Sequence, residues 1–177
     1  MTKKIVAVMA LSLVASSAFA SQAKNLVTGG GDAGFILGTN GMSGSFYTSD
    51  EYNIFWNPAF INSMKNWAVV ENGSTAGDGG TSAGFVTDAG AFNVGVFLNH
   101  TDISNGGQPI DLVVGGDTGM KWGVGLTQSM KEGAPSTTKL KAGVMAGAFE
   151  PFFHFTLKDS DGATAENKDS GMTVGTR

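Results

Sequence analysis

The chain has 177 residues, 27 of them Gly, no Cys, a formal net charge of -4, and only 15% charged residues. The lack of Cys excludes disulfides, thiolate metal sites and a Cys nucleophile, and the scattered Lys and Arg exclude a basic surface for nucleic acid. Soluble domains average about 7% Gly and about 25% charged residues. The composition therefore favours strands that present Gly to a crowded wall; a Gly-rich secreted protein with flexible loops is the alternative.

Residues 1–20 have the parts of a secretory signal peptide. Two lysines begin the segment, residues 5–14 are almost entirely apolar, and a small-x-small site ends at Ala20, before Ser21. The apolar run is much shorter than the roughly 20 residues that a membrane-spanning helix needs. We therefore predict cleavage between Ala20 and Ser21 and export across the inner membrane.

Residues 21–65 form a Gly-rich N-terminal segment with helical signals near its end. Asn57 is a good N-cap, Pro58 suits the first helical position, and Phe60, Ile61 and Met64 could form a short apolar stripe. This pattern predicts a short helix near the mouth of a barrel or partly inside it. The formal G-x-G-x-x-G at 29–34 lacks the strand and helix that a dinucleotide site requires, so no cofactor is predicted.

Residues 66–177 contain repeated short segments in which apolar residues alternate with polar or small ones. In 92–99, for example, Phe92, Val94, Val96 and Leu98 share one face. Such period-two alternation predicts strands with one apolar wall and one polar wall. The expected strands are 67–71, 82–87, 91–99, 109–116, 120–128, 139–147, 150–158 and 171–176.

The connections between these strands alternate in length. Tight turns are expected at 88–90, 116–119 and 147–149, and long polar loops at 72–80, 100–107, 129–138 and 159–170. This alternation is typical of an up-and-down antiparallel barrel in a bacterial outer membrane, which turns its apolar wall to lipid. A soluble sandwich turns that wall inward, so alternation alone does not separate the two folds. Aromatic residues near strand ends could form the interfacial girdles of a barrel: Trp67, Phe92, Trp122, Phe149, Phe153 and Phe155.

The polar wall supplies the candidate lumen-facing residues: Asn93, Asn99, Asp111, Lys121, Thr127, Lys141, Glu150 and His154. In a porin such residues tune selectivity; in a small closed barrel they would satisfy one another as an internal polar core. The spacing of His100 and His154 supports no metal site. Because the sequence also shows no catalytic constellation, no enzyme activity is predicted.

One segment resembles a known family. The residues Phe55, Trp56, Asn57, Pro58 and Ala59 resemble the aromatic-Asn-Pro-Ala segment near the N-terminus of fatty-acid-transporter-type barrels and of porin-like major outer-membrane proteins. The resemblance implies an outer-membrane barrel with this segment in or near a plug. Phe60 stands where those transporters usually carry Gly, and none of their substrate-binding residues maps onto this sequence.

These observations predict an all-β fold, an antiparallel up-and-down transmembrane β-barrel of about 8 strands with a short N-terminal helix. Such barrels commonly end in an aromatic residue, and the last strand here stops at Arg177. We therefore expect either a truncated member of a longer family or, if the chain is complete, a barrel of about eight strands, near the smallest bacterial barrels. The expected location is the outer membrane, the expected partners are its lipids and small solutes, and the expected function is porin-like passive transport. A non-conducting structural or surface-interaction barrel and a soluble periplasmic β-protein are the alternatives; oligomeric state stays open.

Overall fold

The computed structural model describes residues 51–71, 81–100, 108–131, 134–159 and 169–177. Two short 3-10 helices, η1 (Glu51–Phe55) and η2 (Pro58–Ser63), precede eight strands. The strands are β1 (Trp67–Glu71), β2 (Ser82–Asp88), β3 (Asn93–Leu98), β4 (Gln108–Asp117), β5 (Lys121–Lys131), β6 (Ala134–Met145), β7 (Pro151–Asp159) and β8 (Asp169–Thr176). The predicted signal peptide and its cleavage site lie outside the described residues.

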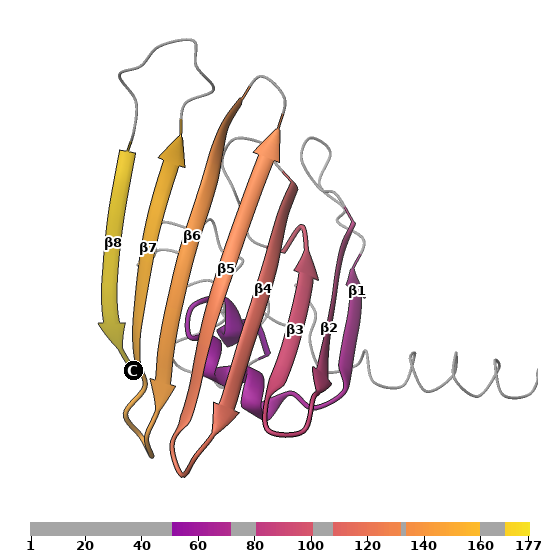
Figure 1. Ribbon diagram of the computed structural model, residues 1–177, viewed down its shortest axis with the longest axis vertical. Helices are drawn as coiled ribbons and strands as arrows, with labels where there is room; N and C mark the ends of the chain where they lie inside the picture. Colours follow the sequence, from indigo (N-terminus) through magenta and orange to yellow (C-terminus); the bar gives the residue numbers. More distant parts are fainter. Residues whose placement is uncertain (1–50, 72–80, 101–107, 132–133, 160–168) are drawn as a thin grey trace, which may run out of the picture.

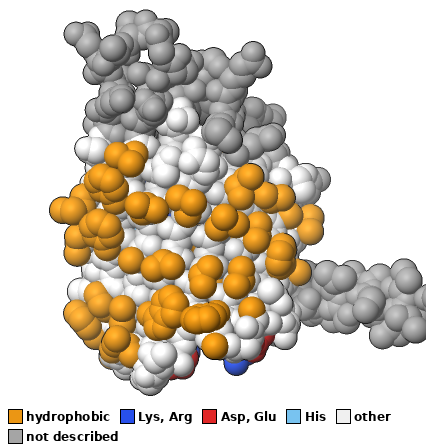
Figure 2. Space-filling model, in the orientation of Figure 1, with side chains coloured by type: hydrophobic (Ala, Val, Ile, Leu, Met, Phe, Trp, Pro, Cys, Tyr) orange, Lys and Arg blue, Asp and Glu red, His pale blue; other side chains and the backbone are white. Residues whose placement is uncertain are grey.

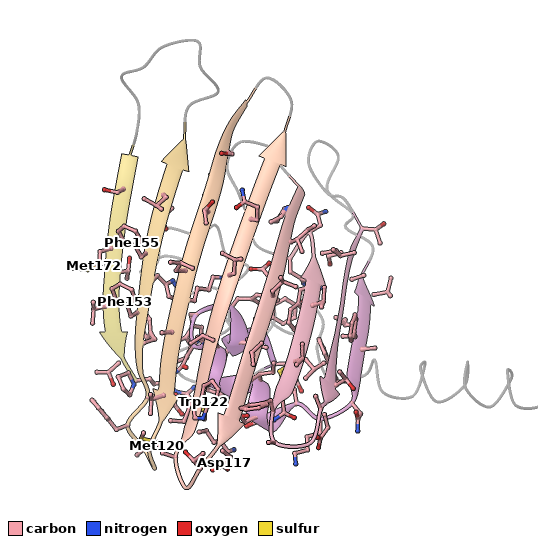
Figure 3. All side chains as sticks on the ribbon, in the orientation of Figure 1. Asp117, Met120, Trp122, Phe153, Phe155 and Met172 are labelled. Carbon is pink, nitrogen blue, oxygen red and sulfur yellow. The ribbon has the colours of Figure 1, made fainter. Side chains whose placement is uncertain are left out.

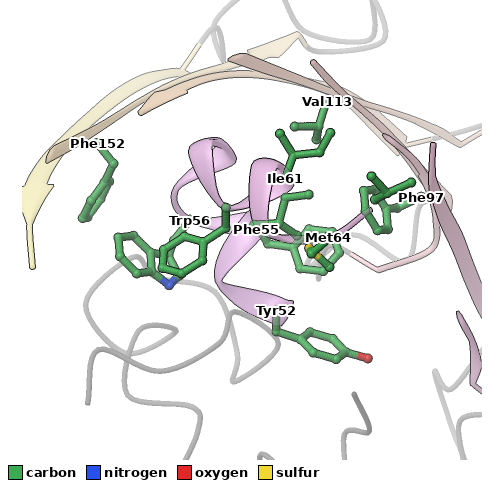
Figure 4. Close-up of a cluster of buried hydrophobic side chains, with 11 residues drawn as sticks. Tyr52, Phe55, Trp56, Ile61, Met64, Phe97, Val113 and Phe152 are labelled. Atoms are coloured by element: carbon green, nitrogen blue, oxygen red, sulfur yellow. The ribbon is translucent and has the colours of Figure 1, made fainter. Parts of the chain in front are cut away.

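The eight strands form one antiparallel sheet in which each strand pairs with its neighbour in the sequence (Figure 1). The all-β class and the up-and-down order are therefore confirmed. The expected closure into a barrel is not observed, because the strand order begins at β1 and ends at β8 and no described pairing joins these two strands. The sheet instead curves around η1 and η2, which lie against its concave side (Figure 4), and it stays open.

The two faces of the sheet differ as the alternation predicts. On β4, Ile110 and Leu112 are exposed on the convex side, which we call the outer face, whereas Asp111 and Val113 are buried on the concave side, the inner face. The antiparallel register aligns the outward residues into continuous rows. The longest row of large apolar residues crosses seven strands and consists of Phe85, Val96, Leu112, Leu126, Leu140, Phe155 and Met172.

The tight turns have the predicted chemistry. In the β2–β3 turn the Asp88 carboxylate accepts a hydrogen bond from the Gly90 amide at 2.8 Å, and in the β4–β5 turn Asp117 accepts one from Gly119 at 3.0 Å. Both glycines have positive φ, +84° and +93°, a conformation that Gly adopts without steric cost. The repeated Asp-x-Gly pattern therefore closes two hairpins at the same end of the strands.

The prediction of a long loop at 129–138 is wrong. Strands β5 and β6 continue through most of it, with Lys131 opposite Ala134 and a register irregularity between Ser129 and Lys131. A hydrogen bond of 2.7 Å from the Thr138 hydroxyl to the Gln128 side chain joins the two strands in this region. The polar composition of the segment suggested a loop, but an antiparallel ladder is made by backbone groups and continues where the side chains become polar.

Candidate functional site

The inner face of the sheet holds residues 51–64, which we call the plug. Helix η2 packs chiefly against β5, β4 and β6. Its start is the predicted one: Asn57 is the N-cap, its side-chain oxygen accepts a hydrogen bond from the Ala59 amide at 3.0 Å, and Pro58 follows at the first helical position. Cap and proline fix the first turn, and with only six residues η2 forms a 3-10 helix, which is typical of short helical pieces.

Three glycines on neighbouring strands form the surface on which η2 lies. Gly115 on β4 pairs with Gly123 on β5, which in turn pairs with Gly143 on β6. We call these three residues the glycine row. A Cβ at Gly123 would collide with the backbone of Pro58 and Ala59, one at Gly143 with the Asn57 side chain, and one at Gly115 with Ile61. The absence of side chains at these positions therefore lets the plug backbone touch the sheet backbone.

Asparagine side chains join the plug to the sheet around the glycine row. Asn57 donates from Nδ2 to the Val144 carbonyl at 3.2 Å, and Asn62 donates from Nδ2 to the Trp122 carbonyl at 2.9 Å. Asn93, on β3, donates to the Asn62 side-chain oxygen at 3.0 Å. These bonds satisfy buried amides of the plug and fix its position along the strands.

A buried ion pair lies on the inner face beyond the plug. Lys141 Nζ, on β6, is 3.1 Å from Asp111 Oδ1, on β4, and the side chains are only 4% and 2% exposed. Thr127, on the intervening strand β5, donates its hydroxyl proton to the same carboxylate. The Lys141 ammonium also lies 5.8 Å from the centre of the Phe55 ring, within cation–π range. The Asp111 carboxylate on β4 thus receives hydrogen bonds from residues of the next two strands, β5 and β6.

His100, just after β3, lies among aromatic rings. Its ring stacks on Phe55 with centroids 5.3 Å apart and makes edge contacts with Tyr52 at 5.8 Å and Phe97 at 5.7 Å. Burial lowers the pKa of His100 to about 4, against an opposing attraction to Asp111. The imidazole is therefore neutral at pH 7, and its Nε2 has no hydrogen-bond partner among the described residues.

Two further side chains hold the aromatic part of the plug. His154, on β7, donates from Nε2 to the Trp56 carbonyl. Arg177 forms a two-point ion pair with Glu150, at 2.6 and 2.9 Å, and its guanidinium lies 5.8 Å from the Trp56 ring and 5.4 Å from the Phe60 ring. The plug therefore has polar and cation–π contacts around Trp56 and Phe60.

The structure brings most of the predicted lumen-facing residues to the inner side of the sheet. Asn93, Asp111, Thr127, Lys141 and Glu150 are buried, and Lys121 and His154 are half-buried with partners in the plug. Asn99 is different: it has a positive φ of 59° at the end of β3 and donates to the Thr81 carbonyl.

Two sets of residues were missed by the sequence analysis. The aromatic contacts of Arg177 depend on the pairing of β7 with β8, and the glycine row depends on strand register. Spaced glycines on three successive expected strands were the only signal for the row.

The outer face carries the apolar side chains. Figure 2 shows hydrophobic side chains spread over this face, with charged ones visible only at its lower edge. Figure 3 shows Phe153 and Phe155 along β7 and Met172 beside them on β8, above Met120 and Trp122 near a tight turn. Trp122 lies 6.1 Å from Phe92 in an edge contact, and Phe92 and Phe149 are exposed.

The proposed aromatic girdle is wrong at one position. Trp67 packs against the inner core, with its ring 6.2 Å from Phe97, because its place in the alternation of β1 turns it inward. Proximity to a strand end says nothing about which face a side chain takes.

Comparison with other proteins adds no assignment. No model of a known family matches the sequence, and no curated protein or solved structure matches it either. Among the described residues no helix is both long and apolar enough to cross a membrane, and no three His, Asp or Glu side chains gather as metal ligands. The site that the described residues form is an internal polar and aromatic assembly around the plug.

Proposed function

We propose that this chain forms the wall of a bacterial outer-membrane β-barrel, with its outer face in lipid, and that small solutes pass by porin-like diffusion through the polar interior. One observation carries the proposal: the sheet has the polarity of a membrane wall. Large apolar side chains cover the outer face, while an ion pair and several amides are buried on the inner face. The N-terminal signal pattern gives the route of export.

The size of the apolar surface argues against a water-facing role. A soluble monomer rarely exposes a contiguous apolar patch above a few hundred Å², whereas here apolar rows continue from strand to strand across most of the sheet. Complete burial of a Leu, Ile or Phe side chain is worth about 1.5–3 kcal/mol; because these side chains are only partly exposed, leaving each one in water forgoes roughly half of that. Lipid acyl chains remove that cost for the whole face at once.

A charge on the outer face tests membrane residence. Val124, in the middle strand β5, is 50% exposed, and Val124→Arg should destabilise the inserted protein by about 2–4 kcal/mol, the cost of Arg near a bilayer midplane. Thr118→Arg, in an exposed tight turn, is the matched control and should insert normally. Flotation with lipid vesicles and urea unfolding measure both effects. Equal behaviour of the two variants, or wild-type protein that stays out of vesicles, would refute the lipid-facing role.

The plug supports a second candidate function, a non-conducting structural barrel. The plug backbone lies directly on the sheet. Its own Phe55 and Trp56 side chains, together with Phe97 of β3, fill the space beside it. Single-channel recording in planar bilayers separates the two. Steps of current from folded, inserted protein support passive transport; inserted protein without current supports the structural role.

A further inference from the structure

The outer side of the β5–β6 hairpin changes from apolar to polar between two successive register pairs. Leu126 on β5 lies opposite Leu140 on β6, and both side chains are exposed. The next outward pair along the hairpin is Gln128 and Thr138, both half-buried. Because side chains alternate between the two faces of a sheet, this pair takes the same direction as the two leucines. The apolar surface of β5 and β6 therefore ends before Gln128 and Thr138.

The polar pair lies between apolar neighbours and keeps unused hydrogen-bond donors. Ile110 on β4 and Leu157 on β7 flank it in the same register row, and both are exposed. The Thr138 hydroxyl donates to the Gln128 side-chain oxygen at 2.7 Å, and Gln128 forms no other side-chain hydrogen bond with the described residues. Its amide N–H groups are therefore available to a partner outside the sheet. Hydrocarbon offers no acceptor for such groups, and an unsatisfied amide is costly there.

The hairpin continues past the polar pair. Strands β5 and β6 stay paired as far as Lys131 and Ala134, about 10 Å beyond Gln128 at roughly 3.3 Å per residue. Figure 1 shows both strands extending past β3 and β4 at the end opposite the tight turns. Ser136, the next outward residue of β6, is also polar and half-buried. Beyond the leucines, the outward side chains of the hairpin that the structure describes are thus polar.

The apolar band of the outer face is also short along the strands. Its exposed ends are Phe92 and Leu98 along β3, and Met120 and Leu126 along β5. Each stretch measures about 20 Å at roughly 3.3 Å per residue, and the tilt of the strands in a barrel reduces its height further. Outer-membrane barrels carry an apolar band about 25 Å tall. On these strands the outer face therefore matches a thin hydrocarbon layer.

We propose that Gln128 and Thr138 meet the polar headgroup layer of the bilayer, and that the end of the β5–β6 hairpin beyond them stands outside the hydrocarbon. The inference rests on the proposed membrane function. Phosphate and ester oxygens of lipid headgroups accept hydrogen bonds from the Gln128 amide, whereas acyl chains do not. The outer face therefore leaves the acyl chains at least one row closer to the tight turns on β5 and β6 than on β4 and β7.

Fluorescent labels at two depths test this boundary, because the chain has no Cys. Val124→Cys lies in the middle of the apolar face, and Ser136→Cys lies beyond the polar pair. Each variant carries a small environment-sensitive fluorophore and is refolded into vesicles whose lipids bear a nitroxide either on the headgroup or deep in the acyl chain. We expect the headgroup nitroxide to quench the label at position 136 several-fold more than the chain nitroxide does, and the opposite order at position 124.

The other outcomes separate the two proposals. Quenching at position 136 mainly by the chain nitroxide, or by neither lipid while position 124 is quenched, overturns the headgroup boundary and leaves the lipid-facing role in place. Quenching at neither position refutes the lipid-facing role itself, and the boundary with it.

Two double variants test the polar pair directly. Gln128→Leu with Thr138→Leu completes the apolar row between Ile110 and Leu157, whereas Gln128→Asn with Thr138→Ser keeps it polar. Hydrophobic mismatch is penalised for each Å of thickness, so the first double variant should raise the ratio of insertion into long-chain over short-chain lipid vesicles by about 2- to 10-fold. The second should match the wild-type ratio. Equal ratios for all three inserted proteins would overturn the inference.

Discussion

The glycine row makes a sharp prediction about the plug, because one glycine can be compared with a near neighbour. Gly123 and Gly125 both lie on β5 and both face inward. A Cβ at Gly123 would lie 2.6 Å from the Ala59 nitrogen and closer still to the Pro58 backbone, whereas a Cβ at Gly125 would have no neighbour nearer than 3.6 Å. Gly123→Ala should therefore displace the plug, and Gly125→Ala should leave it docked.

The expected size follows from the nature of the obstructing atoms. Adding a methyl group to a filled site costs about 1–3 kcal/mol, and here backbone rather than a flexible side chain blocks the space. This cost shifts the docking equilibrium of the plug by about 5- to 150-fold, since about 1.4 kcal/mol is tenfold. Gly125→Ala meets only ordinary van der Waals contacts and should gain about 0.5–1 kcal/mol from the lower chain entropy of Ala.

Labelling of a single cysteine measures the docking equilibrium. Met64→Cys places a thiol at the end of the plug, at a position that is buried in the docked state. Iodoacetamide labelling, followed by mass spectrometry of the inserted protein, should be 5- to 150-fold faster, by the estimate above, when Gly123→Ala is added to this background. Addition of Gly125→Ala should leave the rate unchanged or lower it. Equal labelling rates in the two backgrounds would show that the plug does not rest on the glycine row.

Three further predictions concern polar groups inside the sheet. Asp111→Asn leaves Lys141 buried without a carboxylate and should lower the free energy of unfolding by about 3–5 kcal/mol in urea titrations; the double variant with Lys141→Met should recover most of this loss. His100 has a pKa of about 4 against 6.5 when solvated, so the unfolded state binds the proton first and stability should fall by about 3 kcal/mol between pH 6.5 and pH 4. His100→Phe should remove that part of the acid sensitivity, and an unchanged pH profile would contradict the assignment. Asn57→Ala removes the N-cap and a bond to β6 and should cost about 1–2 kcal/mol, and it should speed labelling of the Met64→Cys thiol.

The strands and their inward and outward faces could be predicted because alternation is a local property. Asn93 and Leu98 were assigned to opposite walls from the sequence alone, and burial places them there. The N-cap at Asn57 was likewise readable from one short motif. Errors arose where a local feature was taken as evidence for something that it does not determine: polar composition for a loop, and position near a strand end for an outward direction. Polar residues at 129–138 indicated a loop although their backbone continues the ladder, and the position of Trp67 near a strand end did not reveal its inward direction.

The site itself depends on register, which the sequence does not display. Gly115, Gly123 and Gly143 are distant in the chain and become one surface only when β4, β5 and β6 align. The same holds for Asp111 and Lys141, which are separated by 30 positions and joined across an intervening strand. High Gly content indicated a crowded inner wall, but not which glycines the plug touches.

The strand register that aligns the glycine row on the inner face also aligns apolar residues on the outer face. This arrangement of the two faces bears on the proposed lipid environment of the outer face. A Gly in a strand interior forgoes side-chain packing and costs about 0.5–1 kcal/mol relative to Ala. On the inner face this cost is offset by packing of the plug, whose backbone contacts the strands where the glycines carry no side chain. On the outer face the adjacent residues of the same strands are apolar: Val124 is exposed, and Val114 and Val144 are half-buried. A bilayer accepts apolar side chains without protein contacts, so these outer valines are consistent with the proposed lipid-facing role. The Val124→Arg and Gly123→Ala variants therefore probe two sides of one arrangement: the first should weaken insertion with the plug still docked, and the second should release the plug from protein that is still inserted.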